Sequence, residues 1–304
     1  MEQPVPALDI LVPTHNMVDI TKKCMEAIYF NTQSPFHLIV VDDSTDKLTP
    51  VYFQELQENG VAPLRKVTNL TFIHRDTPFK TGNEFFNLGF RYAKTDYIAT
   101  VMNSVRVEPD WEIEALRLLA GNPQFGIACL KCLFGGDNNK VGHIESAGIK
   151  MVKYIPSDIG RDLAVHRLTR IYEVDACQWA FAILRKKAVV GVLDDFLFYG
   201  FRGWDDIDNS FVVKSKGWKI AYCGYGTGYH EPRATRGDNS EQAGKENHAN
   251  GEQFYRRWGL WDEYVKDHPD KKDLHEMPKE VKAVQELIER TAFQQIREEV
   301  PVCP

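Results

Sequence analysis

The chain has 304 residues, of which 43% are hydrophobic and 26% are charged, as is ordinary for a globular protein. This length allows one large α/β domain with a C-terminal extension, or two smaller domains. The formal net charge of −6 argues against a dedicated nucleic-acid binder, because an acidic surface repels phosphate backbones.

The first hundred residues alternate between short apolar runs and segments with helical spacing. The apolar runs predict strands over 9–13, 36–41, 70–74 and 97–102, and the segments between them predict helices over 20–30, 50–59 and 81–94. Strand–helix–strand repeats of this kind form a parallel sheet with helices on both faces.

The alternation weakens after residue 103. Further strands are predicted over 125–134, 144–154, 180–184 and 218–222, with a short helix after 185–187 and another helix over 205–215. The polar segment 231–250 predicts a long loop, and loops of this length in compact domains are often functional. Helices are expected over 253–265 and 279–300, and they could mediate self-association or pack on the core.

Cys129 and Cys132 have the C-x-x-C spacing of redox and zinc sites. Their segment reads as a buried strand, however, where positions three apart point to opposite faces. No second pair of this kind and no nearby Cys/His pair completes a metal site, so we expect reduced core cysteines. We also find no secretion signal and no apolar run of about 18–20 residues, and we therefore expect an intracellular, cytoplasmic protein without a transmembrane segment.

Two polar segments follow neighbouring predicted strands. Residues 13–16 (PTHN) supply backbone amides and short polar side chains, and residues 42–46 (DDSTD) supply carboxylates that can accept hydrogen bonds from a base or a ribose. Ligands of open parallel sheets sit beyond the carboxyl ends of the strands. Such residues also cap helices, but the two segments together favour a ligand-binding rim. Asn103 and Ser104 extend this rim, although neither carries the carboxylate that divalent cations prefer.

The densest acidic cluster is Asp205, Asp206 and Asp208. One of these carboxylates could act as a general base, although acids at a helix N-terminus also complement the macrodipole. Further on, His230 could bind a metal or a phosphate, or be structural. Arg233 and Arg236 suit the clamping of a diphosphate, or form a solvated surface.

Taken in order, several motifs resemble an inverting family 2 glycosyltransferase of the GT-A type. They are ILVPTHN, IVVDDSTD, NLGFRYAKTDYIATVMNSVRVEPDW, GHIESAG, the VDA…LRKKAVVGVLDDF…GWDDID run and GYHE, within residues 8–231. The resemblance implies a Rossmann-like mixed sheet flanked by helices. It places a nucleotide-binding part at about 1–110, an acceptor part at about 111–250 and a C-terminal helical extension at 251–304.

The resemblance also assigns roles to residues. Asp206 matches the catalytic base, with Asp205 as its nearest rival. Pro13, His15 and Asp43 match positions that hold the base, commonly uracil, and Lys80 or Thr81 falls near a basic position. The expected nucleotide-sugar contacts are Pro13, Thr14, His15, Asn16, Asp43, Lys80, Asn83, Asn103, Ser104, Arg233 and Arg236.

Two positions depart from the family pattern. Ser104 stands where relatives carry a metal-binding aspartate, while His230 matches a histidine that can complete the metal site. The resemblance thus implies Mg²⁺ or Mn²⁺ with Ser104 and His230 as ligands, while the missing aspartate argues against a metal at this position. Trp179 stands where many relatives have a small residue, which indicates a partly filled acceptor site or an aromatic platform for a sugar. Trp179 and Trp204 are the expected acceptor contacts.

These features predict transfer of a sugar from a nucleoside diphosphate, expected to be UDP, to a hydroxyl of a saccharide or another acceptor. The diphosphate charge could be neutralised by a weakly held metal, or by Lys80, Arg233 and Arg236 without metal. The alternative is a non-catalytic module that binds a nucleotide sugar or a glycan. A nucleotidyltransferase would instead carry a Gly-rich, basic first loop, which residues 13–16 are not.

Overall fold

The computed structural model describes residues 5–136, 139–195, 197–198, 200, 203–231 and 241–269. The chain divides into two compact units. The first comprises Met1–Phe79, Phe85–Leu193 and Asp206–Asp238, and the second comprises Lys80–Glu84, Asp194–Asp205 and Asn239–Pro304.

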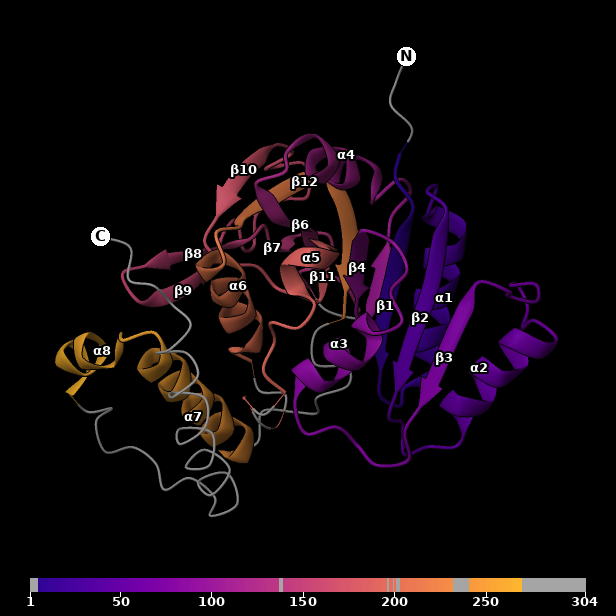
Figure 1. The fold of residues 1–304 in the computed structure, drawn as a ribbon, viewed down its shortest axis with the longest axis horizontal. Helices are drawn as coiled ribbons and strands as arrows, with labels where there is room; N and C mark the ends of the chain where they lie inside the picture. The colour runs from indigo at the N-terminus through magenta and orange to yellow at the C-terminus, as the bar shows by residue number, and fades with distance from the viewer. Residues whose placement is uncertain are drawn as a thin grey trace. The chain divides into compact units, whose positions relative to one another are not determined.

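The first unit contains a ten-stranded mixed sheet, counted over the described residues (Figure 1). Its N-terminal part is parallel, with β1 between β2 and β4 and with β3 outside β2. The elements are β1 (Leu8–Thr14), α1 (Val18–Asn31), β2 (Phe36–Asp42), α2 (Leu48–Glu58), β3 (Leu70–His74), α3 (Gly82–Phe90) and β4 (Tyr97–Val101). The register pairs Thr14 with Asp42 and Asp42 with His74, so the three strands end at one edge.

The rest of the sheet is mixed. β11 runs antiparallel to β4 and β6, β12 runs parallel to β6, and β10 forms the edge beside β12. Short β5 and β7 pair with β12 and β6. The bounds are β5 (Val105–Val107), α4 (Ile113–Gly121), β6 (Phe125–Phe134), β7 (Ile144–Ser146), β10 (Ile171–Val174), β11 (Phe181–Arg185), α5 (Lys186–Val189), α6 (Asp205–Ser215) and β12 (Lys219–His230). A separate hairpin consists of β8 (Ile149–Val152) and β9 (Ile155–Asp158).

The central strands are buried along their whole length, which explains their continuous apolar sequences. Helix α1 turns Cys24, Met25 and Ile28 inward at helical spacing, and these side chains pack in the same core as the strands. The predicted mixed sheet flanked by helices and its alternating N-terminal elements are therefore confirmed. The five cysteines among the described residues are free and buried, and they include Cys129 and Cys132, for which this was expected.

Three predicted elements were wrong. The strand over 144–154 is broken at Gly148, whose φ is +91° and where a Cβ atom would lie 2.7 Å from Val174 Cγ1. Residues 241–250 of the predicted loop over 231–250 belong to α7 (Glu241–Arg257), while 232–240 lie outside the described residues. The helix over 253–265 is split between α7 and α8 (Trp261–Asp267), with Gly259 in the left-handed region between them. Helix α4 and strands β5, β9 and β10 were not predicted.

The second unit is held by contacts of its own. The Trp204 ring packs on Phe254 and Tyr255 of α7, at centroid distances of 5.4 and 5.2 Å. A Cβ atom at Gly251 would lie 2.9 Å from that indole, so glycine allows the close approach. The predicted helix over 279–300 lies outside the described residues, and the predicted division at residue 250 stays a prediction. No helix in the described part of the chain is long and apolar enough to cross a membrane.

Candidate functional site

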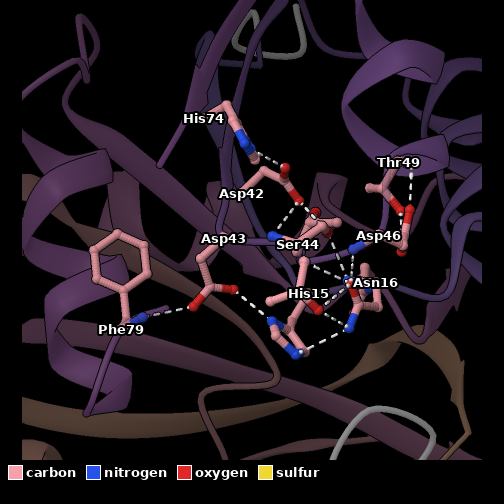
Figure 2. A network of polar contacts seen from close by, with 12 residues as sticks. His15, Asn16, Asp42, Asp43, Ser44, Asp46, Thr49, His74 and Phe79 are labelled. Carbon is pink, nitrogen blue, oxygen red and sulfur yellow. Dashed lines mark hydrogen bonds and ion pairs between the residues drawn. The ribbon is translucent and has the colours of Figure 1, made fainter. Parts of the chain in front are cut away.

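The carboxyl ends of β1 and β2 are joined by an interaction between His15 and Asp43 (Figure 2). His15 Nδ1 lies 2.7 Å from Asp43 Oδ1, and the backbone N–H of Phe79 donates to Asp43 Oδ2 at 2.7 Å. The carboxylate is only 2% exposed, whereas the imidazole side chain is 37% exposed. The hydrogen bond to Asp43 raises the pKa of His15 above its ordinary value, against the opposing effect of burial. The pair therefore joins a buried acceptor to a ring that solvent can reach.

Asn16 holds the two loops of this rim together. Its backbone N–H donates to Ser44 Oγ at 2.6 Å, and its side-chain oxygen accepts the N–H groups of Thr45 and Asp46 at 2.8 and 3.0 Å. Asn16 and Met17 both have positive φ, which is uncommon outside glycine and which these bonds help to hold. Asn16 thus shapes the loop, while its side-chain oxygen is already used by the chain.

Asp42 and Asp46 serve the fold rather than the open rim. Asp42 is fully buried and accepts from Ser44 Oγ at 2.5 Å, with His74 Nδ1 2.6 Å away. Burial raises the pKa of the Asp42 carboxyl, while the bonds to Ser44 and His74 lower it. Asp46 accepts the N–H groups of Leu48 and Thr49 at the start of α2, as the helix-cap alternative predicted. Asp43 is the aspartate of this segment that fits the ligand interpretation.

The Met102–Ser104 segment follows β4 and is fixed on both sides. Asn103 is buried, and its amide donates to Thr21 Oγ1 of α1 at 3.0 Å. The Ser104 carbonyl accepts the N–H of Glu231 at 2.9 Å, beside the pairing of Val105 with His230. The fold thus brings Ser104 and His230 together, as the predicted metal site required. The Met102–Ser104 segment contains no carboxylate, which is the ligand that Mg²⁺ and Mn²⁺ prefer, and the side-chain N–H of Asn103 is directed to α1.

His230 has a carboxylate partner that the sequence did not reveal. Glu145 of β7 places Oε2 2.8 Å from His230 Nδ1, and Cys132 of β6 donates to the same oxygen at 3.6 Å. Ligand atoms of these three residues lie within 4.8 Å of one another. No Cys/His pair lies near Cys132 in the sequence, but the pairing of β12 with β6 brings His230 close to it in the fold. Glu145 belongs to the GHIESAG motif, which carried the resemblance but no assigned role.

Asp206 and Trp179 meet at one residue of α6. The Ser210 hydroxyl donates to the Asp206 carbonyl at 2.7 Å, and Trp179 Nε1 donates to Ser210 Oγ at 3.4 Å. Trp179 is 0% exposed and makes an edge contact with Phe86 at 5.5 Å between centroids. Its ring therefore offers no open platform for a sugar. Burial agrees with the other alternative, in which a bulky side chain fills space that a small residue would leave.

Residues 9–189, which are more than half of the chain, match the family described as glycosyl transferase family 2. The chain belongs to this family. The predicted resemblance is confirmed, and the prediction of a glycosyltransferase is confirmed at the level of the family.

Two solved structures of glycosyltransferases share the GT-A type fold. A structure of GalNAc-T7 with UDP, GalNAc and Mn²⁺ has a TM-score of 0.65 and 12% identity, and the match covers 100% of this chain and 59% of that chain. A structure of S. aureus TarS residues 1–349 with UDP-GlcNAc has a TM-score of 0.53 and 13% identity, covering 80% and 64%. At these identities the likeness shows the fold alone, and this chain spans less than two thirds of either of those chains. No curated protein matches the chain.

The remaining site residues predicted for this family 2 chain are placed as follows. Pro13 and Thr14 are buried in β1. In the second unit, Lys80 is exposed, while Asn83 is buried with its amide donating to the Asp194 carbonyl at 2.8 Å. Asp205 is also buried, and its Oδ1 has no hydrogen-bond partner among the described residues. Arg233 and Arg236 lie outside the described residues. All of these assignments stay predictions.

Proposed function

We propose that this family 2 chain transfers a sugar from a UDP-sugar to an acceptor hydroxyl, with inversion at the anomeric carbon. The observation that carries the proposal is the buried Asp43 carboxylate beside the half-exposed His15, at the carboxyl ends of two parallel strands. This is where open α/β sheets bind nucleotides. Both similar structures contain a uridine nucleotide, which supports UDP as the carrier.

The nucleotide half of the proposal rests on unused acceptor capacity. An ionised carboxylate offers about four lone-pair positions. Among the described residues, Asp43 accepts from His15 and from the N–H of Phe79. The remaining capacity suits the N3–H donor of uracil, and the His15 ring can pack beside the base. Asn16 then acts by holding the loop rather than by contacting the nucleotide through its side-chain oxygen.

The chemical step is a direct displacement. The acceptor oxygen forms a bond to the anomeric carbon as the bond from that carbon to the diphosphate oxygen breaks, so that UDP leaves with the bonding electrons. The Asp206 carboxylate takes the proton of the acceptor hydroxyl. Asp206 is half-buried and is the second residue of α6. One turn later, the Ser210 hydroxyl donates to the Asp206 carbonyl and accepts from the indole of the buried Trp179. We propose that the bulky Trp179 side chain restricts the acceptor, and the acceptor role of Trp204 stays a prediction.

The test is release of UDP from a panel of UDP-sugars, measured beside UDP affinity by calorimetry. Asp206→Asn is expected to lower turnover by about 10²–10⁴-fold and to leave UDP affinity unchanged, because it removes the base and keeps the shape. Asp205→Asn is the matched comparison, since it makes the same chemical change at the neighbouring position. If Asp205→Asn abolishes turnover and Asp206→Asn does not, the base is assigned wrongly. UDP binding without turnover of any donor would favour the non-catalytic binding module.

A further inference from the structure

We infer that this chain binds the diphosphate of its donor without a divalent cation, using His230 held in place by Glu145. The inference rests on the proposed function and follows the alternative without metal, to which it adds His230 as a contact of the diphosphate. It starts from the mismatch between the Met102–Ser104 segment and the oxygen-rich ligand set that Mg²⁺ and Mn²⁺ prefer.

The Met102–Ser104 segment would have to supply the ligands of a metal. Asn103 donates its side-chain N–H to Thr21 Oγ1, which fixes the orientation of the amide and leaves a neutral carbonyl oxygen as the atom that it could offer a cation. The Ser104 carbonyl is engaged by Glu231. Residues 103–104 therefore offer only neutral oxygens and no carboxylate, and neutral oxygens alone are weak ligands for a hard divalent cation.

His230 lies next to this segment. His230 pairs with Val105, directly after Ser104, and its side chain is 15% exposed. Glu145 holds His230 Nδ1 at 2.8 Å from within the sheet, with its own side chain 7% exposed. Among the described residues, no partner bonds to the other ring nitrogen, Nε2. Because Nδ1 is used, Nε2 is the atom that His230 can present to a phosphate oxygen, and an N–H at this position donates a hydrogen bond there.

Cys132 completes a cluster with Glu145 and His230 that resembles a metal site. Thiolate, imidazole and carboxylate together are typical of zinc rather than of magnesium or manganese. Here Cys132 and His230 both approach the same oxygen of Glu145, as two donors approach one acceptor. Glu145 therefore orients His230, while Cys132 is a second, longer donor to the same carboxylate and lies outside this positioning pair.

The first experiment measures UDP affinity by calorimetry on the whole chain, in EDTA and in Mn²⁺. The inference predicts the same affinity in both, and a loss of about tenfold for His230→Ala in both. A rise of about tenfold or more on adding Mn²⁺ would overturn it and leave the proposed function standing. Failure of UDP to bind under either condition would overturn both.

The second experiment separates positioning from metal binding. Glu145→Gln keeps an oxygen acceptor for the His230 Nδ1–H, whereas Glu145→Ala removes it. UDP affinity is therefore expected to fall in the order wild type, Glu145→Gln, Glu145→Ala. The ¹⁵N spectrum of the His230 ring should show a protonated Nδ1 in the first two proteins and a change of tautomer in Glu145→Ala. A ring whose spectrum is the same in all three proteins would contradict the positioning role.

Cys132→Ser is the matched control, because the hydroxyl can still donate to Glu145 but is a poor zinc ligand. It should leave UDP affinity unchanged. Metal analysis of the purified chain tests the alternative directly. Stoichiometric zinc that is lost in Cys132→Ser together with UDP affinity would show that the cluster is a metal site and that the inference is wrong.

Discussion

The two ends of the parallel strands carry the same pair of residue types in opposite order. At the amino ends, Asp9 of β1 contacts His37 of β2 at 2.8 Å, and at the carboxyl ends His15 follows β1 and contacts Asp43, which follows β2, at 2.7 Å. Both aspartates are buried. The two pairs differ in how many further hydrogen bonds the aspartate carboxylate accepts from the chain. This difference distinguishes a structural clamp, which holds the fold together, from a pair that can bind a ligand.

The Asp9 carboxylate is saturated by the chain. Besides His37, it accepts the backbone N–H groups of Lys94 and Thr95 at 2.8 and 2.7 Å and the Thr95 hydroxyl at 2.8 Å. Its partner His37 is engaged at its second nitrogen by Thr71 Oγ1 at 2.8 Å. Asp43 accepts two donors among the described residues, which leaves about half of its capacity. A half-used buried carboxylate beside an exposed ring is what a ligand can complete.

The largest expected effect is the loss of stability in Asp9→Asn. The amide places a donor where the chain already presents donors, so the free energy of unfolding should fall by about 3 kcal/mol. Chemical denaturation measures this change. UDP affinity of the folded protein should not change, and a selective loss of UDP affinity with normal stability would show that the amino-terminal edge is not a mere clamp.

Asp43→Asn should affect UDP affinity more than it affects stability. It should lower UDP affinity by about tenfold, because one acceptor oxygen becomes a donor, and it should cost less stability than Asp9→Asn. Calorimetry and denaturation on the same two variants make the comparison direct. Equal UDP affinity in Asp43→Asn and wild type would break the distinction between the two ends.

The pH dependence of stability tests the His15–Asp43 pair at the carboxyl ends of the strands. The bond to Asp43 raises the folded pKa of His15 above 6.5. Its contribution is therefore fully present below about pH 6.5 and is lost as the pH rises through the raised folded value. The difference in unfolding free energy between wild type and His15→Asn should shrink from pH 5 to pH 9. A difference that stays constant or grows would contradict the charged pair.

Lys94→Ala gives the smallest expected effect. The Lys94 ammonium lies 3.4 Å from His37 Nε2 in an exposed position, while its backbone N–H is the group that binds Asp9. The substitution keeps that N–H, so the change in unfolding free energy should stay below about 0.5 kcal/mol. A larger loss would mean that the side chain, and not the backbone, carries the clamp.

The sequence predicted the rim because its signals are local. Buried parallel strands read as unbroken apolar runs, and the polar residues that end them must lie at one edge, which placed His15 and Asp43 correctly. Glu145 could not be assigned in this way, since its partner His230 lies on a strand that is distant in the chain. The orientation of Asn103 toward Thr21 and the burial of Trp179 depend on packing, which residue type alone does not specify.

A crystal structure of the chain with UDP tests the central claim most directly. The account predicts the uracil ring against Asp43 and His15, with its N3–H donating to the Asp43 carboxylate, and the diphosphate running toward Ser104 and His230. Uracil bound at any other place, with the Asp43 and His15 pair left out of contact, would contradict it.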